Sequence, residues 1–252
     1  MRAVLLLLLA LAALPARGEE VVAALSQNRI SINTNFDGSE ILIFGAVKRE
    51  TPIPGDAPLE VVITVSGPSK PVTVRRKDRR FGIWVNVEGA EIDRAPSFYA
   101  VATSSDWNAV MTDTEDLRHE VSVGRAIRAV GAASEVGDVA AFTEALIRIR
   151  EDENLYQTNI GTVTFDQQTL FNTSVRLPAN LTEGAYTTRF FLTRAGRVVD
   201  SHETVIDVNK VGLERFLFSL SRERPLVYGL LSLAIAIAAG WSASAFFRYL
   251  RG

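Results

Sequence analysis

The chain has 252 residues, 47% of them hydrophobic, and its net charge is −2. Between Glu19 and Arg224, inside the two apolar ends described below, it carries 23 basic and 29 acidic residues, which argues against general nucleic-acid binding. The absence of cysteine excludes a lipid anchor on cysteine, a thiol nucleophile and a Cys-ligated metal. An exported domain of this size without disulfides favours a bacterial envelope.

The N-terminus begins with a short apolar segment, Val4–Leu14. It is too short to cross a bilayer, which needs roughly 20 apolar residues. Ala16-Arg17-Gly18 supplies a small-x-small cleavage pattern, with Glu19 as the mature start. We therefore expect a signal peptide over residues 1–18. An uncleaved anchor is the alternative.

Residues 19–115 read as a first β-sandwich-like region. Ile41–Val47 is a continuous apolar run of the kind that suits a fully buried strand, and Leu59–Val65 has one entirely apolar face. Turn residues at Gly67–Ser69 punctuate the pattern. Short strands at this spacing indicate an antiparallel, immunoglobulin-like sandwich.

A basic cluster lies at a predicted hairpin turn, just before an alternating strand that begins at Phe81. Near an anionic surface each basic residue contributes about 1 kcal/mol, so the cluster could contact lipid headgroups or an acidic partner. A solvated turn is the simpler interpretation. An aromatic beside polar residues can line a groove, but we favour a place in a second core layer. The candidate anion or partner contacts are Arg75, Arg76, Lys77, Arg79, Arg80 and Trp84.

Residues 116–157 switch to helical periodicity, with Asp138 as a predicted N-cap and Phe142 and Leu146 on one apolar face. Residues 158–210 form a second β region. Its clearest hairpin joins Tyr186–Leu192 to Val198–Val208 through a short connection that contains Gly. The mainly β part could be two small sandwiches joined by helices or one sandwich with a helical insertion. We favour two.

Two histidines, His119 and His202, are each followed by a glutamate. Such pairs can bind metal or act in acid–base catalysis, but two distant pairs with no third ligand favour structural, solvent-exposed histidines. The sequence shows no phosphate-binding glycine loop, Gly-x-Ser-x-Gly, His-Glu-x-x-His or calcium loop. We expect no catalytic residue, no metal and no cofactor.

Residues 211–224 precede the second apolar segment. Leu213, Phe216, Leu217 and Leu220 recur at helical spacing, which predicts a juxtamembrane amphipathic helix. An early start of the following helix is the alternative.

Residues 225–247 carry no charge and are long enough to cross a membrane as one helix. Small residues four apart align on one face and would let another helix approach closely, although an Ala-rich span produces such spacing by chance. The candidate helix–helix contacts are Ser232, Ala236, Gly240 and Ser244. Basic residues flank both ends, so the signal peptide decides the orientation: a periplasmic body and a short cytoplasmic tail, 248–252.

Several stretches carry a resemblance to a known family, and together they cover nearly the whole mature chain. They include Phe36-Asp37-Gly38, Gly82-Ile83-Trp84-Val85-Asn86, Pro96-Ser97-Phe98-Tyr99, Leu177-Pro178-Ala179-Asn180, Gly184-Ala185-Tyr186, Lys210-Val211-Gly212-Leu213-Glu214 and Gly240-Trp241. The chain resembles the alphaproteobacterial putative transmembrane protein family, a set of uncharacterised membrane-anchored envelope proteins. The resemblance implies no assigned activity, and it implies a link to permeases that resemble sulfite or organosulfonate exporters.

These observations favour a non-enzymatic, single-pass inner-membrane protein with its bulk in the periplasm. We expect it to serve as an interaction or accessory subunit of an integral membrane partner, such as a sulfite-exporter-like permease, and to bind no nucleic acid. The alternative is a periplasmic binding module that passes a small anionic solute to a permease, with the basic cluster and Trp84 near the site. A hydrolase with unrecognised carboxylates is the least favoured.

Overall fold

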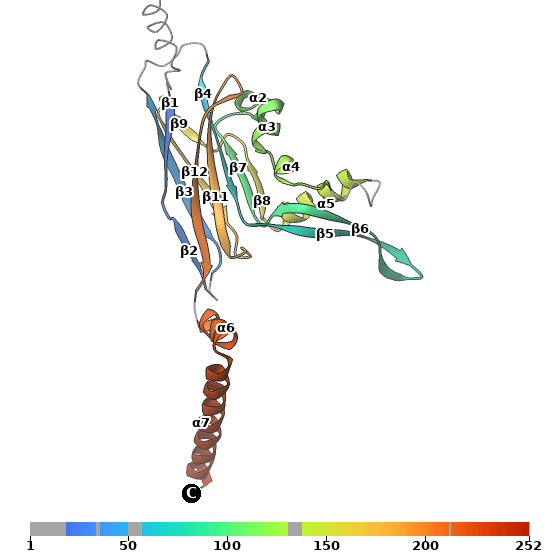
Figure 1. Ribbon diagram of the computed structural model, residues 1–252, viewed down its shortest axis with the longest axis vertical. Helices are drawn as coiled ribbons and strands as arrows, with labels where there is room; N and C mark the ends of the chain where they lie inside the picture. Colours follow the sequence, from blue (N-terminus) through green and yellow to red (C-terminus); the bar gives the residue numbers. More distant parts are fainter. Residues whose placement is uncertain (1–18, 34–35, 50–56, 131–137, 212, 252) are drawn as a thin grey trace, which may run out of the picture. The chain divides into compact units, whose positions relative to one another are not determined.

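The computed structural model describes residues 19–33, 36–49, 57–130, 138–211 and 213–251 (Figure 1). The predicted signal peptide lies outside the described residues. The strands are β1 (Glu19–Leu25), β2 (Arg29–Ile32), β3 (Ser39–Arg49), β4 (Leu59–Ser66), β5 (Ser69–Arg80), β6 (Ile83–Pro96), β7 (Tyr99–Thr103), β8 (Tyr156–Asn159), β9 (Thr164–Asp166), β10 (Leu170–Leu177), β11 (Gly184–Arg194) and β12 (Arg197–Lys210). The helices are α2 (Trp107–Val110), α3 (Asp113–His119), α4 (Val123–Ala126), α5 (Val139–Asp152), α6 (Leu213–Glu223) and α7 (Pro225–Arg251).

Two sheets form the β body, and both take strands from both β regions of the sequence. One has the order β1-β3-β10-β9 and the other β2-β12-β11-β4-β7-β8. β3 pairs antiparallel with β1 and β10, β10 with β9, β11 with β12 and β4, and β4 with β7, whereas β7 and β8 are parallel. The prediction of a mainly β, antiparallel fold is confirmed. The strands interleave in one body with the helices inserted between them, rather than in the two separate sandwiches we favoured.

The core lies between these two sheets. Alternate residues of β10 are buried, including Phe171 and Val175. Phe171 meets Phe190 of β11 with ring centroids 6.1 Å apart, a contact that joins the first sheet to the second. Alternation with period two therefore places one face of each strand in the core.

Strand β4 is buried on both faces. The predicted apolar face is confirmed at Leu59 and Ile63, but Val62 and Thr64 on the other face are also buried. Helix α2 contacts β4, and Figure 1 shows α2, α3 and α4 beside β4 and β7. This helical cover is the physical reason for the second buried face.

Strand β3 departs from its prediction as a fully buried strand. Ile41, Ile43 and Val47 are buried, whereas Leu42 and Phe44 on the opposite face are exposed. The prediction from the continuous apolar run is therefore wrong. An antiparallel sheet commonly covers only one face, and apolar residues on the other face do not reveal which face is covered.

The local signals of the second half are confirmed. Asp138 caps α5 by accepting a hydrogen bond from the backbone N of Ala141 at 3.1 Å, and Phe142 and Leu146 are buried. The β11–β12 hairpin turns at Ala195-Gly196, where both residues have positive φ (49° and 74°). Positive φ at both central positions is what a two-residue hairpin turn requires.

The C-terminal segment forms a separate unit that contains α6 and α7. Among the described residues, Pro225–Phe246 is the one helical stretch long and apolar enough to cross a membrane. Helix α7 continues to Arg251, so the residues predicted as a tail extend the same helix. The side chains of Leu213 and Phe216, which belong to the predicted amphipathic face of α6, lie outside the described set.

Candidate functional site

Strands β5 and β6 form a long two-stranded hairpin that extends away from the sheets in Figure 1. Its base is part of the folded body: Val74, Ala90 and Ile92 are buried. The Arg76 guanidinium lies 5.1 Å from the centroid of the Phe142 ring on α5. These contacts position the base of the hairpin and leave its end free of the core.

The hairpin turns at Phe81 and Gly82, with φ values of 50° and 85°. Left-handed backbone suits Gly, Asn and Asp, and a bulky side chain there is an outlier. Phe81 nevertheless occupies the first position, and its side chain is fully exposed (106%). The turn therefore carries a strained residue that gains no contact within the described structure.

Both faces of the hairpin end carry a large apolar residue beside a basic one. Arg79 is directly opposite Trp84, and Arg80 is opposite Ile83, so each pair shares a face. Trp84 is 69% exposed and Ile83 is 64% exposed. Our preference for Trp84 in a second core layer is wrong, because the strand that holds it extends beyond any layer that could cover it.

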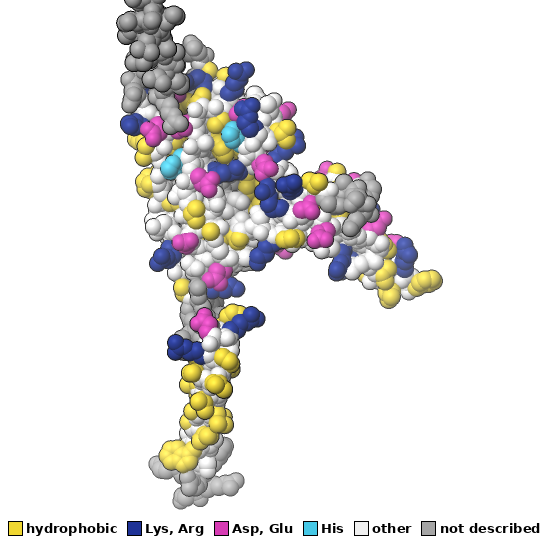
Figure 2. All heavy atoms as spheres, in the orientation of Figure 1, with side chains coloured by type: hydrophobic (Ala, Val, Ile, Leu, Met, Phe, Trp, Pro, Cys, Tyr) yellow, Lys and Arg dark blue, Asp and Glu magenta, His cyan; other side chains and the backbone are white. Residues whose placement is uncertain are grey.

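The charge of the hairpin is unlike that of the whole chain. From Lys70 to Glu88 there are six basic residues and two acidic ones. Arg76 pairs with Glu88 at 2.9 Å and Arg80 with Asp78 at 3.8 Å. Four further basic residues have no carboxylate within ion-pair distance among the described residues, and Figure 2 shows dark blue and yellow side chains gathered at the hairpin end. These four are Lys70, Arg75, Lys77 and Arg79.

A groove of about 410 Å³ runs between β5 and α5. Arg75, Arg76 and Arg148 line it together with Glu144 and Phe142. The structure thus places all six predicted contact residues on one hairpin, but it divides them. Two border the groove at the base, and the others stand at the exposed end.

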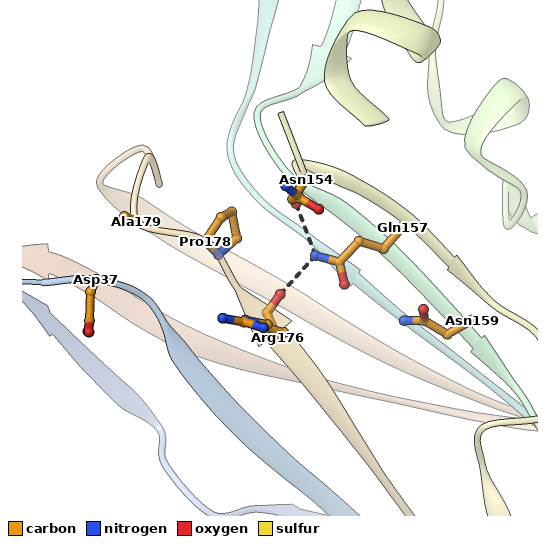
Figure 3. A pocket seen from close by; sticks show the side chains of 7 residues that line it. All are labelled: Asp37, Asn154, Gln157, Asn159, Arg176, Pro178 and Ala179. Atoms are coloured by element: carbon orange, nitrogen blue, oxygen red, sulfur yellow. Dashed lines mark hydrogen bonds between the residues drawn. The ribbon is translucent and has the colours of Figure 1, made fainter. Parts of the chain in front are cut away.

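A second, polar pocket of about 470 Å³ was missed by sequence reasoning (Figure 3). Gln157 donates from Nε2 to the backbone oxygens of Asn154, at 3.0 Å, and Arg176, at 2.8 Å. Asp37 and Ala179 reach the pocket from two of the stretches that carry the family resemblance. The lining residues are Asp37, Asn154, Gln157, Asn159, Arg176, Pro178 and Ala179.

The histidines do not form the adjacent pairs suggested by the sequence. His119 lies 3.5 Å from Glu115, one helical turn away, while Glu120 binds Arg94 at 2.6 Å. His202 lies against the ring of Phe190. Within the described ranges, no group of three or more His, Cys, Asp or Glu side chains is arranged to hold a metal ion.

The tyrosines with displaced pKa values are buried and have structural roles. Burial raises the pKa of Tyr99 and Tyr186, and it raises the pKa of Tyr156 to about 12. Each hydroxyl donates to a backbone oxygen: Tyr99 to Val121 at 2.7 Å, Tyr156 to Pro96 at 2.8 Å and Tyr186 to Thr182 at 2.8 Å. These groups are neutral hydrogen-bond donors that tie loops to the β body.

The small-residue face of α7 is exposed along its length. Ser232 Oγ donates to the backbone oxygen of Tyr228 at 2.9 Å, which satisfies the hydroxyl within the helix. A Cβ atom added to Gly240 would meet nothing within 4 Å. Ser232, Ala236, Gly240 and Ser244 are thus open to another helix.

Fold and helix together define a mainly β protein with a C-terminal membrane anchor. The model of a family described as "Putative transmembrane protein" (Alph_Pro_TM) matches residues 20–249, and the chain belongs to that family. No curated protein matches it. The sporulation control protein Spo0M from Bacillus subtilis is similar to this chain at 11% identity and a TM-score of 0.28, over 81% of this chain and 55% of that one.

Proposed function

We propose that this protein is a non-enzymatic accessory subunit of an integral membrane partner such as a transporter. In this proposal α7 crosses the inner membrane, the β body lies in the periplasm, and the small-residue face of α7 docks on the partner. The observation that carries the proposal is the open stripe of Ser232, Ala236, Gly240 and Ser244 on a helix that belongs to a membrane anchor.

Helices pack in lipid by other forces than in water. Lipid tails are as apolar as leucine, so helices associate there through close packing and not through hydrophobic burial. A helix that anchors a protein needs only apolar side chains. A row of small side chains lowers the lipid contact of α7 and favours close approach of a second helix.

The ionisable groups with displaced pKa values support a scaffold rather than a catalyst. The three tyrosines bind backbone oxygens, and Glu19 binds Arg49 and Arg194 at 2.9 Å each. Catalytic sites displace pKa values in order to move protons. Here the displaced groups are occupied by structural partners.

The test is co-purification from detergent-solubilised membranes with the double substitution Ala236→Leu and Gly240→Leu. The added bulk should reduce recovery of the native membrane partner at least tenfold, as measured by mass spectrometry. The matched control is Ala234→Leu with Ala238→Leu, which adds bulk to the opposite face and should leave recovery unchanged. Equal recovery from both variants would contradict the proposal.

A second candidate function rests on the groove between β5 and α5. Arg75, Arg76 and Arg148 line it against a single acidic residue, Glu144, so it suits a small anion. In this alternative the protein passes the anion to a permease. Calorimetric titration with sulfite and methanesulfonate should show binding that Arg148→Gln weakens, and absence of heat with both anions would remove this candidate.

A further inference from the structure

The end of the β5–β6 hairpin carries three large apolar side chains, those of Phe81, Ile83 and Trp84, that are exposed. Phe81 holds a left-handed backbone conformation that costs stability for a bulky residue, and its ring contacts nothing that would repay the cost. Ile83 and Trp84 follow it at the start of β6 and are mostly exposed. Residues that break a local rule without a structural gain mark functional sites.

We propose that this hairpin end docks on an anionic lipid surface. Phe81, Ile83 and Trp84 enter the headgroup region, and Lys77 and Arg79 contact lipid phosphates. Tryptophan favours the membrane interface because its indole ring is apolar and its N–H can hydrogen-bond, and the Phe and Ile side chains add apolar area. Basic side chains next to them add attraction to anionic headgroups.

The distribution of these residues favours a bilayer over a protein groove. The turn and both faces of the hairpin carry the same mixture of apolar and basic side chains, through the pairs Arg79–Trp84 and Arg80–Ile83. A bilayer can contact all sides of such a hairpin end, whereas a protein groove would contact mainly one face. The membrane anchor α7 also keeps a bilayer at high effective concentration.

The charge distribution points to an anionic surface. The hairpin carries an excess of four positive charges from Lys70 to Glu88, in a chain whose net charge is −2. An anionic membrane would therefore attract the hairpin and repel the remainder. The predicted effect falls with salt, because exposed charges are screened beyond about 10 Å at 0.1 M ionic strength.

The test uses the full chain with Trp107→Phe and Trp241→Phe, which leaves Trp84 as its sole tryptophan. The protein is reconstituted into vesicles that contain brominated phosphatidylcholine, with or without 30% phosphatidylglycerol. All vesicles carry the quencher, so contact with the same or a neighbouring bilayer quenches Trp84. We expect strong quenching with phosphatidylglycerol, at least a fivefold weaker effect without it, and a loss on adding salt.

Two variants separate lipid contact from hairpin folding. Phe81→Asn suits the left-handed turn, so it should preserve amide protection in the hairpin while reducing the quenching at least twofold. The double substitution Lys77→Gln and Arg79→Gln should abolish the dependence on phosphatidylglycerol. Leu117→Asn, which removes an exposed apolar residue from α3, is the control and should change nothing. Unquenched Trp84 in both lipid mixtures would overturn the proposal and point to a protein occupant, and equal quenching in both would overturn the anionic part.

Discussion

Glu19 is nearly inaccessible, and its charge is held by two guanidinium groups. Its side chain is 7% exposed and lies 2.9 Å from Arg49 and 2.9 Å from Arg194. Burial alone raises the pKa of Glu19, but the hydrogen bonds and charges of the two arginines outweigh it, so its pKa is lowered from 4.5. The ionised carboxylate is thus part of the fold at the start of β1.

The substitution Glu19→Gln should lower the free energy of unfolding by about 2 kcal/mol, since it removes the charge that two half-buried arginines share. Chemical denaturation of the detergent-purified protein measures this loss. The matched control is Glu20→Gln: Glu20 pairs with Lys48 at 3.7 Å on the surface, and its loss should cost less than about 1 kcal/mol. Equal losses would contradict the role of Glu19.

The pH dependence follows from the same group. Because the pKa of Glu19 is lower in the folded state, its contribution is present above pH 4.5 and is lost as the pH falls through the folded pKa. Glu19→Gln should therefore flatten the decline of stability below pH 4.5. If the stability of this variant declined below pH 4.5 as steeply as that of the unsubstituted protein, other carboxylates would govern the decline.

At the residue scale the sequence identified the basic cluster and Trp84 but not their exposure. The basic cluster and Trp84 are recognisable from composition, because five basic residues in six positions are rare in a buried strand. Whether Trp84 packs inward depends on how far the hairpin extends beyond α5. That is a tertiary property, and alternation along one strand does not encode it.

At the element scale, Asp116 holds the connection between α3 and α4. Its Oδ1 accepts from the backbone N of Val121 at 3.1 Å and of Ser122 at 2.7 Å, and Oδ2 accepts from Ser122 Oγ at 2.8 Å. Arg189 of β11 donates to the backbone oxygen of His119 at 2.7 Å. Side chains from helix and sheet thus fix a short connection that covers β4 and β7.

Replacement of Asp116 with Ala should cost about 2 kcal/mol, because it leaves buried backbone donors unpaired. The control is Asp113→Ala in the same helix, which removes an acidic residue from the first turn and should cost less than about 1 kcal/mol. Denaturant titration followed by circular dichroism measures both. A similar small loss for the two variants would contradict the role of Asp116.

Elements with local signals were predictable, and elements defined by packing were not. The cap of α5 and the β11–β12 turn depend on residues close in sequence. The second buried face of β4 depends on helices that follow it by some forty residues or more in the chain. The polar pocket likewise joins Asp37 to Asn154 and Arg176, and no periodicity links such distant positions.

At the scale of the whole molecule, the buried tyrosines make the free energy of unfolding depend on pH. The pKa of Tyr156 is raised from 10.0 to about 12, and those of Tyr99 and Tyr186 are raised too. Their contribution to stability is fully present below pH 10 and is lost as the pH rises toward 12, because the unfolded chain ionises first.

Tyrosinate absorbance should therefore show a late phase in which these three tyrosines ionise only as the protein unfolds. Far-ultraviolet circular dichroism recorded in parallel should change over the same pH range. Tyr156→Phe should reduce the late phase by one tyrosine. Ionisation of Tyr99, Tyr156 and Tyr186 near pH 10 without loss of the β signal would contradict the burial of these groups.

The interleaving of the two β regions is also a property of the whole molecule. Strand β10 pairs with β3, and β11 pairs with β4, although more than a hundred residues separate the partners. Strand patterns predict that sheets form, but pairing between distant strands depends on the closure of long loops. The mainly β class was therefore predictable, and the choice of one body over two was not.

The most direct test of the account is the membrane topology of the full chain. A reporter that is active only in the periplasm, fused after Lys210 or after Gly252, reads the location of each position in cells. The account predicts activity at Lys210 and none at Gly252, because α7 lies between them as the membrane span. Activity at Gly252 alone, or at neither position, would contradict a periplasmic β body held by a C-terminal anchor.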